Sequence, residues 1–119
     1  MQVEIITSLF DIKQSIDSIF EFLGEKRDFN HYLSNKLLRR GVERELEIIG
    51  EAAKRILKID NIVEIENARK IVDFRNWISH GYDKIDNTIV WGIVNKQLPL
   101  LKKQVENLLT NESEITSPI

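Results

Sequence analysis

Apolar side chains recur at helical spacing through most of this chain. In the first stretch they stand 4, 3, 4, 3 and 4 residues apart: Ile5, Leu9, Ile12, Ile16, Ile19 and Leu23. This spacing lines one face of a helix, and Gly24 is of the residue type that commonly ends one. The same period continues through residues 34–58 at Leu38, Val42, Leu46, Ile49, Ala53 and Ile56. Two long amphipathic helices are therefore predicted.

Two further helices follow from the same reasoning. A shorter one covers residues 67–79, and a fourth begins after Asp86, whose side chain can act as an N-cap. The stripe of the fourth helix is Val90, Val94, Leu98, Leu101, Val105 and Leu108. Pro99 should kink this helix near its middle, because proline has no amide hydrogen to donate.

Four amphipathic helices without strand-like alternation predict an all-α protein, most simply an up-and-down four-helix bundle. The polar residues 25–32, anchored by Phe29 and Tyr32, leave room for an extra short helix. No linker divides the chain, so we expect one domain over residues 1–110 and a frayed tail over 111–119. The stripes are long for 119 residues, which favours burial of their remainder in a homodimer with two-fold symmetry.

Composition excludes several classes of site. The chain has no cysteine and two histidines, so we expect no disulfide, no thiolate chemistry, no metal site and no cofactor. Glu47 and Glu51, one helical turn apart, are a weaker metal-binding alternative. No apolar run approaches the ~20 residues of a membrane span, and the N-terminus lacks a basic signal-peptide start. A cytoplasmic protein without membrane contact is expected.

Charge is distributed unevenly along the chain. The net charge of −2 argues against a broad nucleic-acid groove, yet residues 26–44 carry six basic and two acidic side chains. Solvated helix faces are the simpler interpretation of this stretch. A local strip that faces phosphate groups is the alternative.

Residues 75–82 (RNWISHGY) hold the clearest candidate site. They combine Arg75, which stays charged, with His80, which titrates near neutrality, and the phenol of Tyr82. A histidine at a helix C-terminus is stabilised as imidazolium and could act as a general acid, while Arg75 could hold phosphate oxygens. The plainer alternative is that His80 only caps the helix and Arg75 forms a surface salt bridge.

Cleavage of RNA without a metal requires one group to accept the 2′-hydroxyl proton, one to protonate the leaving 5′-oxygen and one to stabilise the phosphorane. One copy of the chain has a single histidine in this region. A two-fold dimer that joins the 67–79 helices would place two histidines and two arginines in one cleft.

Three blocks, in order, resemble HepT-like toxins of the HEPN superfamily. They are residues 46–55 (LEIIGEAAKR), the R-x4-H-x-Y signature within residues 75–82, and residues 90–94 (VWGIV) with 98–101 (LPLL). Together they cover most of residues 5–109. The resemblance implies a HEPN-like helical-bundle homodimer with a metal-independent ribonuclease cleft at the dimer interface.

The same resemblance assigns roles within the signature. Arg75 and His80 would be the catalytic pair acting on RNA, with Asn76 in support. The protein partner would be an MNT-type nucleotidyltransferase antitoxin that silences the toxin by transferring AMP to Tyr82. Two other hypotheses stay open: a non-catalytic helical partner that binds nucleotide or docks the nucleotidyltransferase, and a purely structural dimerisation module.

Overall fold

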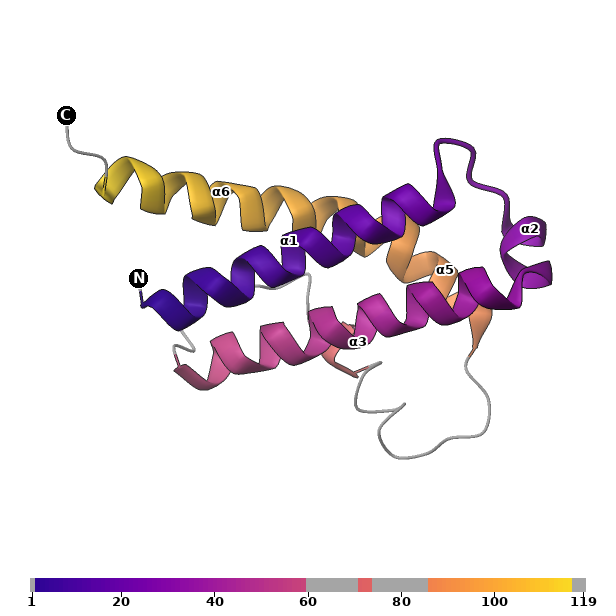
Figure 1. The fold of residues 1–119 in the computed structure, drawn as a ribbon, viewed down its shortest axis with the longest axis horizontal. Helices are drawn as coiled ribbons and strands as arrows, with labels where there is room; N and C mark the ends of the chain where they lie inside the picture. The colour runs from indigo at the N-terminus through magenta and orange to yellow at the C-terminus, as the bar shows by residue number, and fades with distance from the viewer. Residues whose placement is uncertain (1, 60–70, 74–85, 117–119) are drawn as a thin grey trace.

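The protein is a bundle of helices (Figure 1). A computed structural model describes residues 2–59, 71–73 and 86–116, with side chains described up to residue 111. The elements are α1 (Val3–Leu23), α2 (Phe29–Ser34), α3 (Lys36–Ile59), α5 (Asn87–Gly92), the π-helical turn η2 (Ile93–Gln97) and α6 (Leu98–Thr116). The described residues contain no strand, so the predicted all-α class is confirmed, and α2 is the extra short helix.

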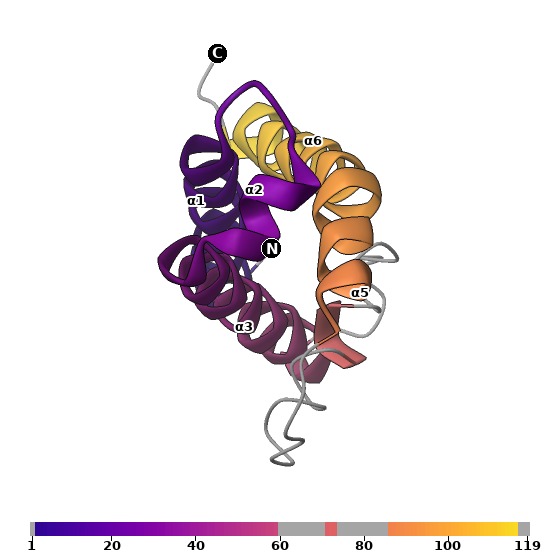
Figure 2. The ribbon, with the colours of Figure 1, turned by 90° about the vertical axis from the view of Figure 1, so that its right-hand side faces the viewer.

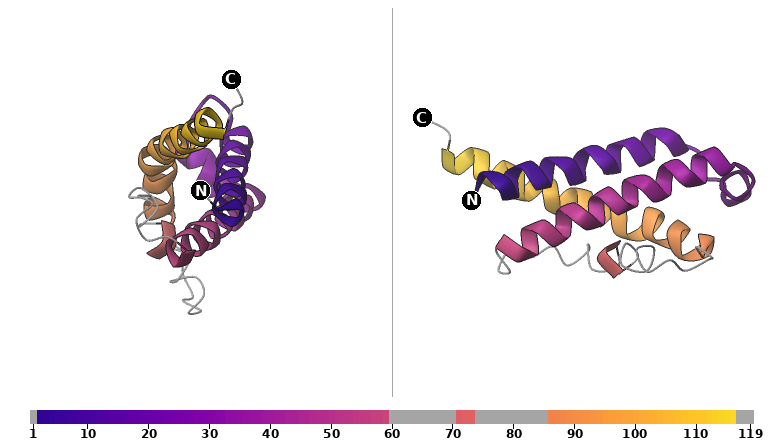
Figure 3. Two further views of the ribbon diagram at one scale, coloured as in Figure 1. Left: turned by 90° about the vertical axis from the view of Figure 1, so that its left-hand side faces the viewer. Right: turned by 60° about the horizontal axis from the view of Figure 1, so that its bottom comes forward.

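Helices α1 and α3 lie side by side and run in opposite directions, with more contact than any other pair of elements (Figures 1 and 3). Helix α6 packs along α1, and Figure 2 shows α5 facing α3 across the bundle. The start of α1 and the end of α6 share one end of the molecule, and α2 closes the other. Residues 71–73 are helical and contribute Ile71, which is fully buried, to the core.

The predicted stripes form this core. All their members on α1, α3 and the α5–α6 unit are buried, except Leu23, Leu38 and Leu108, which are partly buried against the same cluster. The expectation that the stripes exceed one core is therefore wrong for the described helices. The strongly exposed apolar side chains lie outside the stripes instead: Val3, Phe10, Leu37, Ile89 and Leu100.

The predicted break in the fourth helix is present, and it has a definite form. Pro99 cannot donate to the carbonyl of Asn95, and the turn immediately before α6 is widened into the π-helix η2. Asn95 Nδ2 donates to the carbonyl oxygen of Trp91 at 2.8 Å, which satisfies an acceptor in this irregular region. Helix α6 then continues to Thr116, so the boundary expected at residue 110 does not coincide with the end of the helix.

An ion pair ties α6 to α1. Lys102 Nζ lies 2.8 Å from Asp17 Oδ1, and Lys13 Nζ lies 3.5 Å from Asp17 Oδ2. Partial burial acts to raise the pKa of Asp17, but the hydrogen bond and charge of Lys102, aided by Lys13, lower it overall. The hydrogen bond to Asp17 raises the pKa of Lys102, whose ammonium also lies 5.7 Å from the ring centre of Phe20.

Two positions are occupied by glycine for different structural reasons. Gly24 ends α1 with a φ of 72°, a conformation that favours glycine, and its amide donates to the carbonyl of Phe20 at 3.0 Å. Gly41 lies against Phe22: a Cβ atom placed there would be 3.3 Å from the ring atom Cε2. The close approach at Gly41 therefore involves a side chain of α1.

Candidate active site and its surroundings

Arg75, Asn76, His80 and Tyr82 lie outside the described residues. The predicted catalytic pair, supporting residue and modification site therefore stay predictions. The structure does describe the two elements between which this segment runs. Residues 71–73 precede it and are anchored by the buried Ile71, and Asp86 follows it at the start of α5.

Asp86 is the N-cap of α5, as predicted. Its Oδ1 accepts hydrogen bonds from the amides of Thr88 at 2.9 Å and Ile89 at 3.3 Å, and its carbonyl accepts from the amide of Val90 at 3.1 Å. These bonds satisfy amides that have no partner inside the helix. The chain that leaves the candidate site is therefore fixed in direction at this residue.

Aromatic packing holds α5 against α2. The ring centre of Trp91 lies 5.5 Å from that of Phe29 and 5.3 Å from that of Tyr32. Both contacts have tilted rings at distances typical of favourable aromatic pairs. Trp91 is thus a packing residue between α5 and α2. Trp77 lies outside the described residues.

Tyr32 carries a buried polar atom with an unusual environment. Its side chain is 1% exposed, and its hydroxyl has no hydrogen-bond partner among the described residues. Burial, followed by the nearby charge of Glu43, raises the pKa of this phenol. Glu43 is itself buried and lies 2.9 Å from Arg40 Nη1. Tyr32 therefore stays neutral in the physiological range.

The arginines of the basic strip at residues 26–44 are engaged locally. Arg27 and Arg39 donate to the backbone carbonyls of Gly24 and Leu33. Arg40 pairs with Glu43, and Arg44 lies 3.7 Å from Glu47. These contacts favour the simpler interpretation of the strip as solvated helix faces.

Metal coordination has no support in the described part of the chain. Within residues 2–59, 71–73 and 86–116, no group of three His, Asp or Glu side chains is placed to hold a metal ion. Glu47 of the alternative carboxylate pair contacts Arg44, and Glu51 has an interaction of its own.

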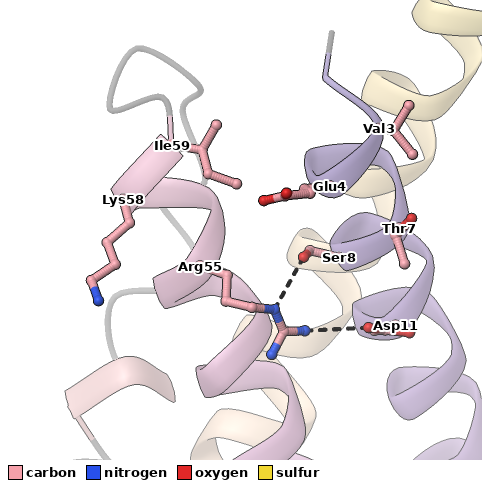
Figure 4. Close-up of a pocket in the computed structure, with 8 residues that line it drawn as sticks. All are labelled: Val3, Glu4, Thr7, Ser8, Asp11, Arg55, Lys58 and Ile59. Carbon is pink, nitrogen blue, oxygen red and sulfur yellow. Dashed lines mark hydrogen bonds and ion pairs between the residues drawn. The ribbon is translucent and has the colours of Figure 1, made fainter.

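A polar cluster that the sequence did not predict lies between the start of α1 and the end of α3 (Figure 4). Arg55 reaches from α3 to α1, where its Nε donates to Ser8 Oγ at 3.3 Å and its Nη2 to Asp11 Oδ2 at 3.2 Å. These residues border a hollow of about 530 Å³. The sequence features that belong to this cluster are the polar pair Ser8 and Asp11, three residues apart on α1, and the basic residues near the end of α3. The pairing becomes visible only when the contact between the helices is known.

Comparison with known proteins identifies the family. The family described as "Ribonuclease HepT-like" matches residues 12–108. A Methanocaldococcus jannaschii protein named as a candidate RNase, MJ1380, is 38% identical over 82% of this chain and 90% of its own length. A Thermococcus cleftensis protein named "Probable ribonuclease HepT" is 35% identical over 84% of this chain and 91% of its own length.

A third relative, another Methanocaldococcus jannaschii protein named as a candidate RNase, MJ0125, is 30% identical over 89% of this chain and 91% of its own length. No solved structure gives a significant match. None of the described helices is long and apolar enough to cross a membrane. The match to the family over residues 12–108, together with the identity to these relatives, shows that the chain belongs to the HepT-like ribonuclease family of endoribonucleases.

Proposed function

We propose that the chain is the ribonuclease toxin of a HepT/MntA-type toxin–antitoxin pair. One observation carries the proposal: the match to HepT-like ribonucleases over residues 12–108 spans the Arg75, His80 and Tyr82 signature. A chance arginine and histidine five residues apart would not bring this wider match with them.

The chemistry is a metal-independent transesterification. The 2′-hydroxyl of RNA loses its proton to a neutral histidine and attacks the adjacent phosphorus. The bond to the 5′-oxygen breaks, and a protonated histidine donates a proton to that leaving oxygen. Arg75 stabilises the charge of the phosphorane, and Asn76 supports its position. The first product carries a 2′,3′-cyclic phosphate, and the second a free 5′-hydroxyl.

The two histidines come from two copies of the chain. A homodimer with two-fold symmetry brings His80 and Arg75 of each copy into one composite cleft. The exposed apolar side chains support association: Val3, Phe10, Leu37, Ile89 and Leu100 are each more than half exposed. Their burial in an interface would remove apolar surface from water, at roughly 25 cal/mol for each Å².

Regulation is assigned to Tyr82 and an MNT-type nucleotidyltransferase. The Tyr82 oxygen attacks the α-phosphorus of ATP, pyrophosphate leaves and the phenolic proton passes to solvent or a base. The product is a bulky anionic AMP adduct two residues from His80. Such an adduct would block the cleft and compete with RNA phosphate for Arg75.

Induced expression of the wild-type chain beside His80→Ala tests the proposal. Growth arrest and RNA breakdown should appear with the wild type and disappear with the variant, while both proteins stay folded and dimeric. Purified wild type should cleave RNA in EDTA and leave cyclic or 3′-phosphate ends. Cleavage that needs a divalent metal, or that leaves 5′-phosphate ends, would contradict the mechanism.

Tyr82→Phe separates toxicity from silencing. This variant should still cleave RNA, but co-expression of the nucleotidyltransferase should no longer protect the cell. The matched control is wild type co-expressed with the same nucleotidyltransferase, which should lower its rate of RNA cleavage. If wild type and His80→Ala are equally harmless, the non-catalytic helical partner becomes the better hypothesis.

A further inference from the structure

An acidic ribonuclease needs local positive charge to hold a polyanion. The net charge is −2, so the average field of the protein repels RNA. Many basic side chains in the described part of the chain already have partners. The arginines of residues 26–44 contact carbonyls or carboxylates, and Lys13 and Lys102 share Asp17.

The end of α3 is different. A hollow of about 320 Å³ is lined there by Lys54, Arg55 and Lys58, with Glu51 as its one carboxylate. Neither lysine has an ion pair or hydrogen bond among the described residues, whereas Glu51 is already engaged in an interaction. Three cations therefore border one small open hollow, and the net local charge is +1 when Glu51 and Asp11, which pairs with Arg55, are both counted.

Arg55 is held in place beside this hollow. Ser8 and Asp11 accept hydrogen bonds from Nε and Nη2 of its guanidinium. A guanidinium has five N–H donors, so these two bonds leave donors for a ligand and fix the plane in which they lie. Holding the fork in one orientation lowers the entropy lost when a phosphate binds.

Lys58 borders both hollows, and in the larger one it shares the lining with Glu4 and Asp11. Figure 4 shows its side chain on the side of α3 remote from Asp11 and pointing back along the helix, while Arg55 crosses to α1. Lys54, one turn earlier, shares that side of the helix with it. Lys54 and Lys58 thus border the smaller hollow together, and Lys54 is not among the residues that line the larger hollow with Asp11, the carboxylate that balances Arg55.

We propose that this hollow binds a phosphate group of the RNA substrate, at a nucleotide other than the one that is cleaved. The proposal rests on the proposed function, because it takes RNA as the ligand. Phosphate contacts of this kind position a nucleic acid without reading its sequence. Lys54 and Lys58 supply mobile point charges, and Arg55 supplies directed hydrogen bonds.

RNA binding at graded salt concentrations tests the inference. The double variant Lys54→Gln/Lys58→Gln is made in the His80→Ala background, so that the RNA stays intact, and binding is followed by fluorescence anisotropy. Each lost phosphate contact should lower the salt dependence, the slope of log K against log salt, by about 0.7. Because the hollow holds one phosphate group, we expect a slope smaller by roughly 0.7 and an affinity weaker on the order of five-fold near 0.1 M salt.

The matched control is Lys96→Gln/Lys103→Gln, which removes the same charge from exposed lysines on η2 and α6. Its slope should equal that of the parent chain. In the catalytically intact background, the Lys54/Lys58 variant should lose kcat/KM at limiting RNA and keep its kcat at saturation. If the Lys54/Lys58 variant instead unfolds more easily and shows none of these changes in RNA binding, the lysines only stabilise the end of α3. That result would overturn the inference.

The remaining outcomes separate the two proposals. RNA binding by the parent with an unchanged slope in the Lys54/Lys58 variant would overturn this inference alone. Failure of the parent to bind RNA would overturn the proposed function and this inference together. A variant that loses affinity for AMP but keeps its affinity for RNA would show that the hollow takes a free nucleotide, and the assignment to RNA would fall.

Discussion

Replacing Tyr32 with phenylalanine should stabilise the protein. The hydroxyl is buried without a hydrogen-bond partner among the described residues, while the ring packs on Trp91 at 5.3 Å. Tyr32→Phe removes the oxygen and keeps the ring. In the unfolded chain the same hydroxyl is hydrated, so wild type loses that hydration on folding and gains nothing in return.

The expected gain follows from this loss of hydration. A buried polar group left without a partner costs about 1–3 kcal/mol. The ring contact with Trp91 does not enter the comparison, because phenylalanine keeps the ring. We expect Tyr32→Phe to raise the free energy of unfolding by about 1–2 kcal/mol, within the lower part of that range. For a domain of this size, that corresponds to a melting temperature higher by roughly 4–8 °C.

Urea denaturation with an unchanged m-value is the assay, and pH supplies a second test. Because the folded-state pKa of Tyr32 is raised, the unfolded chain loses the phenolic proton first, near pH 10. Wild type is then fully stabilised below that pH and loses stability as the pH rises towards the folded-state pKa. Tyr32→Phe lacks this loss, so its advantage should grow above about pH 10.

Tyr32→Leu is the control, because it removes the hydroxyl and the ring together. It should destabilise the protein, since the contact with Trp91 disappears and a cavity remains. The reasoning would be refuted if Tyr32→Phe lowered the free energy of unfolding by about 1 kcal/mol, the net worth of a formed hydrogen bond. That result would mean that the hydroxyl has a partner in solution.

Three further substitutions test what stabilises the helical bundle. Asp17→Asn should cost less than about 1 kcal/mol at neutral pH, because the Asp17 and Lys102 side chains are 43% and 34% exposed. Since the pKa of Asp17 is lowered, wild type should lose this term as the pH falls below about 4, and urea melts of the variant should show a flatter acid limb. Gly41→Ala should stabilise α3 by up to ~1 kcal/mol, because the half-exposed Phe22 ring can shift, and a lower melting temperature would contradict this. Asp86→Ala should cost about 1 kcal/mol in thermal melts, whereas Asp86→Asn keeps a capping acceptor and should cost less.

The periodicity of apolar residues predicted the main helices well, because an apolar stripe on a helix depends only on local spacing in the sequence. It placed α1, α3 and the α5–α6 unit, the cap at Asp86 and the break near Pro99. It failed where geometry depends on other elements. The extension of α6 to Thr116 runs through polar residues in which Ile115 is the single apolar side chain after Leu109. The contact of Trp91 with Tyr32 depends on how α5 packs against α2.

The candidate site shows the same division. The signature residues Arg75, His80 and Tyr82 were assigned their roles through the resemblance to HepT-like toxins, and they stay a prediction because they lie outside the described residues. The Arg55 cluster could not be predicted from the sequence, because Ser8 and Asp11 are 47 and 44 residues away from Arg55 in the chain. Only the packing of α1 against α3 brings the three together, and sequence spacing does not encode which flanks of two helices meet.

The charge of the chain links the two proposals. A toxin that cuts RNA must attract a polyanion, yet a strongly basic surface would also hold RNA that is not being cleaved. Placing free lysines at one hollow, while most arginines serve local contacts, concentrates attraction at a few phosphates. Under this view the affinity for RNA should fall steeply when Lys54 and Lys58 lose their charge, and only slightly when the engaged Arg44 does. The comparison of these two losses measures how far substrate binding depends on a few placed charges and how far on the average field.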